Sequence, residues 1–487
     1  MRLLLVMPTG LQVGYDNFFS SSPLGIETLA AHARRYADVS LADVRGGSND
    51  FEAHADKMLA DSPEIVGISL NAAPHTNYTL KLAEALRRRR GDLKIIVGGQ
   101  QATFLPRELL GTGNIDAIVR GEGEETLTEI LQRGGDWRGV AGVSWRDNGA
   151  FHDEPDRPLR SDLDSLELPA RDLLPDRSRY RMGAVRVEGI ESSRGCPFQC
   201  SFCSIRNFHR GKWRAKSVQR VMREVDFILE RYPERKVIYF ADDNFATDIR
   251  RVEGICQAII QRRTEAFFWC QARADMLAEH PEIVELMGKA HFAAVLVGIE
   301  TPVERLLASA KKGTKPGQVE KAIKLLHAQD VGIWGTFCLG LPGETPEETR
   351  LAGEYIAKTK VDVAQITVAT PIPGSALYDE AKAAGDIFET DWDRFDFTSP
   401  TMKGQMSKKD LDAIIQKAYL GTYLSGRFLL SLFSRRTNLH RLRQTAFSVF
   451  WTWIKFMIKV RLAALVGYRG KILQPHERQA LEEAKDK

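Results

Sequence analysis

The sequence contains little cysteine and almost no net charge. Its 487 residues include only six cysteines, too few for the disulfide framework of a small secreted protein. Lys and Arg exceed Asp and Glu by 68 to 64, which argues against a surface built for nucleic acid, so no nucleic-acid partner is expected. The apolar run Leu3–Met7 is too short for a signal peptide. We therefore expect a cytoplasmic protein of more than one domain.

Acidic residues are missing from one long segment near the C-terminus. Between Ala413 and His476 there is no Asp or Glu, whereas eleven Lys and Arg occur. Within this segment Phe447–Gly467 is apolar, but Lys455, Lys459 and Arg461 interrupt it, and each central Lys or Arg costs roughly 2.5–3.5 kcal/mol in a bilayer. On a helix its polar residues would form one stripe: Ser448, Thr452, Lys455 and Lys459. Two interpretations stay open: peripheral contact with the inner membrane surface, or an apolar cover on the rest of the protein.

The first 135 residues alternate short apolar runs with amphipathic stretches, a pattern typical of βαβ units around a parallel sheet. Five strands are expected, at Leu3–Met7, Val39–Leu41, Ile65–Ser69, Ile95–Val97 and Ala117–Val119. A doubly wound sheet binds its ligand at the carboxyl ends of its strands. Those ends carry Ser69–Asn71, Gly98–Thr103 and Arg120–Glu125.

The middle of the chain divides into a linker and a second α/β domain. Residues 136–180 are expected to form a hairpin with an Asn148-Gly149 turn, followed by a polar connector. Residues 181–400 then show six further βα units without a crossover reversal, which predicts a partial barrel with its chemistry at the strand carboxyl ends. The six strands are expected at Val185–Glu191, Val237–Phe240, Phe267–Gln271, Ala293–Ile299, Val331–Leu339 and Val363–Ala369. Residues 401–487 are expected to form a basic, aromatic, helical extension.

Three of the cysteines lie together, directly after the first strand of this second domain. Cys196, Cys200 and Cys203 have the spacing C-x3-C-x2-C. Thiolates are the natural ligands of iron–sulfur clusters, and three of them leave one iron of a [4Fe–4S] cluster without a protein ligand. A zinc site completed by His209 is the alternative, but this spacing matches none of the common structural zinc sites. The other cysteines, Cys256, Cys270 and Cys338, have apolar neighbours and are expected to be structural.

The cysteine motif, with Phe202 before the third cysteine, resembles the CxxxCxΦC signature of radical S-adenosylmethionine (SAM) enzymes. Later motifs resemble the subgroup that carries an N-terminal cobalamin-binding domain. These motifs are Arg214–Ser217, Tyr239–Phe245, Gly298–Thr301, Gly340–Thr345 and Pro371–Ser375. The resemblance covers roughly residues 1–400. It implies a Rossmann-like cobalamin-binding domain at residues 1–135, a partial (β/α)6 TIM-type radical SAM barrel at 181–400, and the α-helical extension.

The resemblance also implies the cofactors and part of the site. The open iron would bind SAM, and one electron from the reduced cluster would release a 5′-deoxyadenosyl radical. Phe202 would pack near the adenine, and Asp242, Asp243 and Glu300 would contact SAM or substrate, with strand-end capping as the alternative for these acids. The electron would come from a partner such as flavodoxin or ferredoxin. No catalytic residue is assigned, because the cofactors perform the difficult step.

Cobalamin is expected at the strand ends of the first domain. The residues implied are Ser69, Asn71, Gly98, Gly99, Gln100, Gln101, Gly121, Glu122 and Gly123. No Asp-x-His-x-x-Gly motif occurs, which excludes an axial histidine from that motif. Gln101 stands where relatives often have His. A scaffold domain that has lost cobalamin is the alternative.

The overall layout, including Asp391–Phe397 and the basic extension, is similar to anaerobic magnesium-protoporphyrin monomethyl ester cyclases, bacteriochlorophyll methyltransferases and hopanoid methylases. The resemblance thus implies a hydrophobic small-molecule substrate, a tetrapyrrole or isoprenoid lipid, whose unactivated carbon is methylated. Radical-dependent cyclisation or hydroxylation of a porphyrin-type substrate is one alternative. A non-catalytic metal-cofactor sensor or scaffold is another.

Overall fold

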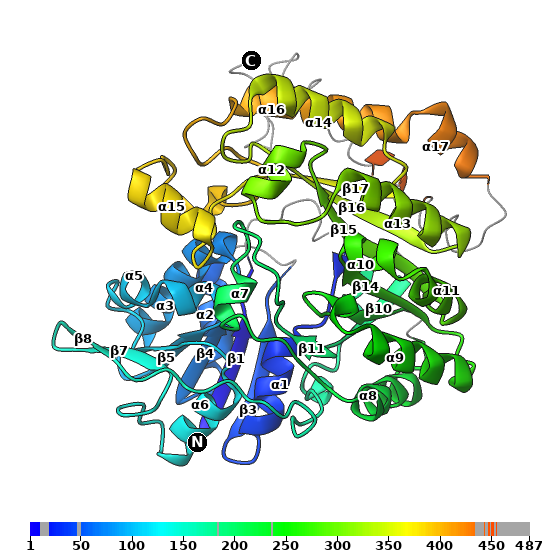
Figure 1. The fold of residues 1–487 in the computed structure, drawn as a ribbon. Coiled ribbons are helices and arrows are strands. Elements are labelled where there is room, and N and C mark those ends of the chain that lie inside the picture. The colour runs from blue at the N-terminus through cyan, green and yellow to red at the C-terminus, as the bar shows by residue number, and fades with distance from the viewer. Residues whose placement is uncertain are drawn as a thin grey trace.

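Two mainly parallel sheets with their own helices make up most of the molecule. The computed structural model describes residues 1–9, 19–45, 50–182, 185–234 and 237–433, together with residues 443, 447, 448, 450, 451 and 454. Figure 1 shows the first sheet, in blue and cyan, beside the second domain, in green and yellow. The α/β class predicted from the sequence is confirmed.

The first sheet has the strand order β3-β1-β4-β5-β6-β7-β8. Its strands are β1 (Arg2–Met7), β3 (Asp38–Asp43), β4 (Ile65–Ser69), β5 (Lys94–Gly98), β6 (Ala117–Val119), β7 (Val143–Asp147) and β8 (Ala150–Asp153). The first five are parallel. From β1 the chain moves outward to β3 and then crosses back to β4, so the topological switch point lies between β1 and β4. An open α/β sheet binds its ligand at such a point.

Helices cover both faces of this sheet. They are α1 (Leu24–Ala33), α2 (Phe51–Leu59), η1 (Ala73–His75), α3 (Thr76–Arg89), α4 (Gln100–Phe104), α5 (Pro106–Leu110) and α6 (Glu124–Gln132). Helices α1 and α6 pack on one face, and α2, α3, α4 and α5 on the other. The apolar strands are buried because both faces are covered.

The predicted hairpin with the Asn148-Gly149 turn is present as β7 and β8. Asn148 and Gly149 both have positive φ, at 47° and 86°, as the two central residues of a type I′ turn require. Strand β7 pairs antiparallel with β6. The hairpin therefore extends the first sheet.

The second sheet is a half-barrel of six parallel strands in sequential order. They are β10 (Val185–Ile190), β13 (Val237–Phe240), β14 (Phe267–Ala272), β15 (Phe292–Glu300), β16 (Gly332–Leu339) and β17 (Val363–Val368). Two short antiparallel strands, β9 (Arg181–Met182) and β2 (Phe19–Ser20), cover the edge of β10. Strand β2 was not predicted, because a two-residue strand has no periodicity.

The outer face of the half-barrel is covered by α8 (Val218–Arg231), α9 (Ile249–Arg262), α10 (Ala274–Glu279), α11 (Pro281–Lys289), α13 (Pro316–Ala328) and α14 (Pro346–Lys358). The short helices α7 (Ile205–Phe208), α12 (Glu304–Ser309) and α15 (Ala376–Ala384) lie instead toward the carboxyl ends of the strands. The connections include the turns η2 (Arg171–Leu173), η3 (Phe245–Thr247) and η4 (Trp392–Arg394). Helix α8 shows why they form. The Ser217 hydroxyl caps it by accepting from Arg220 N–H, and Val221, Val225 and Ile228 recur at helical spacing on its buried face.

The other edge of the half-barrel is covered by the C-terminal region. Helices α16 (Lys408–Tyr423) and α17 (Gly426–Ser431) follow the barrel, and α16 packs beside α14 (Figure 1). The hydroxyl of Tyr423 accepts a 2.9 Å hydrogen bond from Ala364 N–H, and that of Tyr419 a 3.3 Å one from Ile366 N–H. Both amides belong to β17, so the tyrosines satisfy a strand edge that would otherwise be open.

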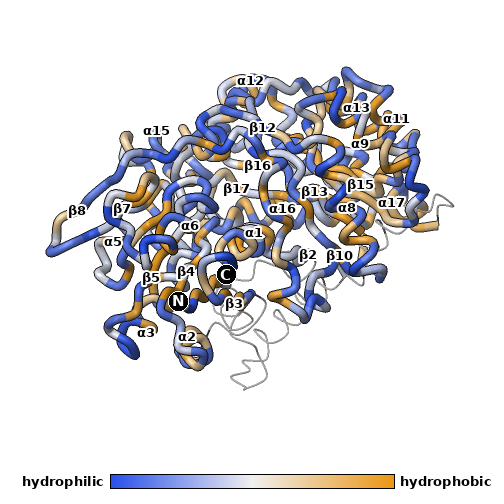
Figure 2. Tube along the Cα trace, turned by 90° about the horizontal axis from the view of Figure 1, so that it is seen from below, coloured by the Kyte–Doolittle hydropathy of each residue, from blue (hydrophilic) through white to orange (hydrophobic). Residues whose placement is uncertain are grey.

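The inner face of the half-barrel is aromatic and is closed at its floor by the C-terminal extension. Trp269, Trp334 and Val363 pack with Tyr423, Phe428 and Phe450, and Phe447 and Ile454 join this cluster. These described residues of Phe447–Gly467 therefore cover the barrel. The polar-stripe residues Thr452, Lys455 and Lys459 lie outside the described residues. Figure 2 shows apolar segments gathered in the interior, around β4, β5 and β15.

Within the part of the chain that the structure describes, no helix is both long and apolar enough to cross a bilayer.

Candidate active site

The three clustered cysteines lie on a loop at the carboxyl end of β10. Two short strands, β11 (Ser193–Arg194) and β12 (Arg214–Ala215), pair on either side of this loop and hold its ends together. Gly195, directly before the first cysteine, has φ +87°, and a Cβ there would collide with the carbonyl oxygen of Lys212. Only glycine fits this position.

The cysteine thiols are partly buried. Burial raises the pKa of Cys203 to about 12 and also raises that of Cys196. A bound metal ion would hold these side chains as thiolates and release their protons. Among the described residues, no three His, Cys, Asp or Glu side chains are grouped to hold a single ion. A [4Fe–4S] cluster does not require the three thiolates to converge on one ion, because each thiolate binds a different iron. The loop therefore fits the cluster.

His209, the fourth donor in the zinc alternative, serves another contact. Its Nδ1 lies 3.0 Å from a guanidinium nitrogen of Arg214 and 3.4 Å from a carboxylate oxygen of Glu122. The ring is thus part of a network between the two domains.

The two aspartates expected near SAM differ in their surroundings. Asp242 is fully buried, and its carboxylate accepts from Ser192 N–H at 2.7 Å and from the hydroxyls of Ser192 and Ser193 at 2.6 and 2.5 Å. Asp243 accepts from Gly195 N–H at 3.0 Å, and burial raises its pKa. Asp242 therefore anchors the start of the cysteine loop, whereas Asp243 lies against the loop itself. SAM contact by either residue stays a prediction.

Glu300 and Phe202 lie near each other at the mouth of the barrel. Lys312 connects them, because its Nζ is 2.6 Å from Glu300 Oε1 and 5.9 Å from the centre of the Phe202 ring. Glu300 has φ +65°, a strained conformation for a non-glycine residue. Gly298 leaves the room for this ion pair, since a Cβ there would lie 2.5 Å from both charged groups. Their roles toward SAM stay predictions.

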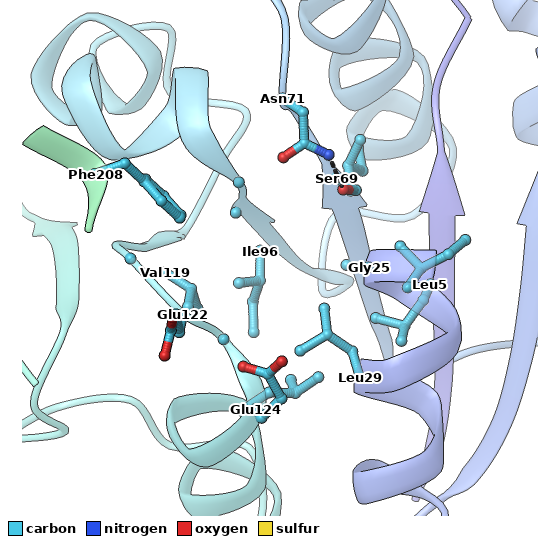
Figure 3. A pocket seen from close by; sticks show the side chains of 18 of the residues that line it. Leu5, Gly25, Leu29, Ser69, Asn71, Ile96, Val119, Glu122, Glu124 and Phe208 are labelled. Carbon is cyan, nitrogen blue, oxygen red and sulfur yellow. Dashed lines mark hydrogen bonds between the residues drawn. The ribbon is translucent and has the colours of Figure 1, made fainter. Parts of the chain in front are cut away.

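A cavity of about 260 Å³ opens at the switch point of the first sheet. Seven of the nine residues predicted to bind cobalamin line it: Ser69, Asn71, Gly98, Gly99, Gly121, Glu122 and Gly123. Figure 3 shows Leu5, Leu29 and Ile96 around its apolar part, with Glu122 and Glu124 nearby.

The shape of this cavity suits part of a large cofactor. Gly99 has φ +111°, and a Cβ there would lie 2.6 Å from Leu70 O, so only glycine fits this position of the cavity wall. Arg194, Phe208 and His209 of the second domain also line the cavity. The residues thus fit a cobalamin held partly in the first domain and partly between the domains.

The two glutamines predicted to bind cobalamin do not line this cavity. The Gln100 amide donates to the Ser204 hydroxyl next to Cys203, and its backbone N–H donates to Asn71 Oδ1 at 3.2 Å. Gln101 is 1% exposed, and its side-chain amide has no hydrogen-bond partner among the described residues. Cobalamin contact by either glutamine stays a prediction.

Several residues of the site were not predicted from the sequence. Arg194 and Phe208 reach the cavity from the second domain, as does His209, which was considered only as a zinc ligand, and Arg273 and Lys312 reach the cysteine loop. Of these, Arg273 could have been found, because it lies two residues after the end of a predicted strand, where site residues concentrate.

The chain matches two family models: the radical SAM superfamily over residues 190–356 and the B12 binding domain over residues 18–131. It is 31% identical to an uncharacterized methyltransferase of Pyrococcus horikoshii, covering 88% of this chain and 94% of that protein. It is 30% identical to the hopanoid C-3 methylase of Methylococcus capsulatus, covering 77% of this chain and 71% of that protein.

The fold is similar to that of the radical SAM methyltransferase TsrM from Kitasatospora setae, solved with cobalamin and a [4Fe–4S] cluster. The TM-score is 0.68 at 15% identity, over 93% of this chain and 99% of that one. At this identity the likeness concerns the fold.

Proposed function

The chain belongs to the cobalamin-dependent radical SAM methyltransferases, and from this premise we propose that it methylates an unactivated carbon of a hydrophobic tetrapyrrole or isoprenoid lipid. Its cofactors are a [4Fe–4S] cluster, SAM and cobalamin. When bound, they supply a 5′-deoxyadenosyl radical that removes hydrogen from the substrate and a methyl group that replaces it.

The chain's own residues hold and align these groups. Cys196, Cys200 and Cys203 would hold the cluster, and the glycine-lined cavity would hold part of cobalamin. Side-chain contacts across the domain boundary fix one site relative to the other. They join Gln100 to Ser204, Glu122 to Arg214, and Glu124 to Arg194.

The inner face of the half-barrel supports a hydrophobic substrate. The Trp269 ring stacks on Tyr239 and on Trp334, with ring centres 4.4 and 5.4 Å apart. Above this aromatic floor, Leu296 and Thr336 follow on the same face and are only partly buried. Large flat or polycyclic molecules pack well on such a surface, and the cysteine loop lies at its upper end.

Product mass tests the proposal. The full chain would be reconstituted anaerobically with iron, sulfide and cobalamin, then given SAM, dithionite and either a hopanoid hydrocarbon or magnesium-protoporphyrin monomethyl ester. We expect a product heavier than one of these substrates by one methylene. A ring-closed or hydroxylated product would favour the porphyrin alternative. Absence of 5′-deoxyadenosine in the presence of reductant would favour a non-catalytic sensor.

The proposal also includes an electron donor, because a flavodoxin or ferredoxin would supply the single electron that the cluster needs.

The proposal further includes a membrane contact. Leu430 and Phe433, 76% and 84% exposed at and just after the end of α17, lie within the acid-free basic segment, which continues after Ile454 with five more Lys and Arg. Exposed apolar side chains together with many basic residues suit an anionic membrane surface.

Sedimentation with vesicles tests the membrane contact. A truncation at Ser407 would remove α16 and its tyrosines from the edge of β17, so the chain should instead end after Ile454. We expect the full chain to sediment with anionic vesicles more than the truncated chain does, and neither to sediment with neutral vesicles. Equal sedimentation of both chains would contradict a role for the segment after Ile454.

A further inference from the structure

One buried arginine lies directly against the cysteine loop. Arg273 is the residue after β14, and it continues the inward-facing series Trp269 and Gln271 toward the mouth of the barrel. It is 7% exposed. A cation this deeply buried is costly unless it is paired and hydrogen-bonded.

The guanidinium is held in one orientation. Its Nε and one terminal nitrogen contact the Asp275 carboxylate at 3.0 and 2.6 Å, and the same nitrogen donates to Lys312 O and to the Thr314 hydroxyl, at 2.5 and 3.2 Å. The Phe198 ring lies on its face, with the guanidinium carbon 3.7 Å from the ring centre. These contacts leave the other terminal nitrogen to face the loop.

That remaining nitrogen donates to a cysteine sulfur. Arg273 Nη1 lies 3.9 Å from Cys200 Sγ. Lys312, the other cation beside the loop, is bound instead to Glu300 at 2.6 Å. Asp275 offsets the charge of Arg273 at long range, but it binds the far side of the guanidinium, so the positive end of the pair points at the sulfur.

We propose that Arg273 raises the reduction potential of the [4Fe–4S] cluster by donating a hydrogen bond to the Cys200 ligand. The inference rests on the cluster assigned above. Hydrogen bonds to the sulfurs and nearby positive charge stabilise the more negative, reduced state. The step affected is the transfer of one electron from an external donor to the oxidised cluster. Arg273 is thus a tuning residue that acts through Cys200, and Asp275 orients it.

A redox titration of the full chain tests this role. The reconstituted protein would be titrated with dithionite and mediators without SAM, and the reduced cluster followed by electron paramagnetic resonance. We expect Arg273→Met to lower the equilibrium constant for one-electron reduction of the cluster about tenfold, which corresponds to a reduction potential about 59 mV lower. Arg273→Lys keeps the charge but not the fixed geometry, so its reduction potential should lie between those of the wild type and Arg273→Met. Arg262→Met is the matched control, because Arg262 makes a similar two-pronged contact with Asp226 at the surface, at 2.6 and 2.9 Å.

An unchanged potential in Arg273→Met, with iron content intact, would overturn the inference. If that variant does not retain iron, Arg273→Gln replaces it, because it removes the guanidinium and its charge but keeps a polar side chain. A lower potential in Arg273→Gln supports the inference, and an unchanged one overturns it. Failure of the wild-type chain to assemble any cluster would instead contradict the assigned cysteine ligands.

Discussion

The carboxylate of Glu122 accepts two hydrogen bonds from the guanidinium of Arg214, at 2.6 and 3.0 Å. Glu122 belongs to a strand-end motif of the first domain, and Arg214 to the strand that closes the cysteine loop of the second. Burial raises the pKa of Glu122, but hydrogen bonds from His209 and Arg214 and the charge of Arg194 hold it below its ordinary value. One carboxylate thus connects the cobalamin cavity to the cluster loop.

Removal of this carboxylate should destabilise the domain boundary. Glu122→Ala leaves Arg214 and Arg194 buried without this partner, which costs about 3–5 kcal/mol of the free energy of unfolding. Urea denaturation of the cofactor-free chain measures the loss. Glu125→Ala is the control, because Glu125 is 43% exposed in its pair with Arg160 and should change stability by less than about 1 kcal/mol. Equal effects of the two variants would contradict the structural role of Glu122.

Cys200→Ala should prevent assembly of the cluster, because two thiolates remain where three are needed. Analysis of iron and sulfide after anaerobic reconstitution checks this, together with the loss of SAM cleavage. Cys256→Ala, on the buried face of α9, should retain wild-type iron content. Retained cleavage in Cys200→Ala would refute the ligand assignment.

The stability of the aromatic cluster on the inner face of the half-barrel should depend on Phe450. Its side chain is 4% exposed, and its ring centre lies 5.0 Å from that of Tyr423. Phe450→Ala should therefore lower the free energy of unfolding by about 3–5 kcal/mol. The neighbouring Trp451 is 47% exposed, and Trp451→Ala should change stability by no more than about 0.5 kcal/mol. Thermal unfolding of both variants checks this. A large loss of stability in Phe450→Ala alone shows that the extension is packed on the barrel, and equally small changes in both variants would contradict it.

Acid should weaken the first domain partly through His75. Burial, assisted by the charge of Arg45, lowers the pKa of His75 to about 4. Between about pH 6.5 and 4 the unfolded chain binds a proton at this site that the folded chain does not, so stability falls as the pH falls through this range. At pH 5 the loss is on the order of 2 kcal/mol.

Urea midpoints of the cofactor-free chain at pH 7.5 and pH 5 test this dependence. His75→Gln should reduce the difference in urea midpoint between the two pH values. An identical pH dependence of stability in the wild type and in His75→Gln would show that His75 does not contribute to the loss of stability in acid.

Local pattern was enough to predict most of the fold. The strands from Ile65 to Ser69 and from Val237 to Phe240 have the bounds that the sequence predicts. Buried parallel strands are continuous apolar runs, and amphipathic helices repeat every 3.6 residues, so both leave a strong local signal. The membrane-facing interpretation of Phe447–Gly467 could not be decided in this way, because an apolar helix face looks the same whether it meets lipid or protein.

The sequence by itself determined the order of the elements, the spacing of the three cysteines and the strand ends that line the cofactor cavity. The tertiary structure alone decided that Arg214 binds Glu122, that Arg273 faces Cys200, and that Tyr419 and Tyr423 cover the edge of β17. Each of these contacts joins residues far apart along the chain. Their partners depend on strand register and on how the two domains dock, and neither leaves a periodic pattern in the residues that make the contact.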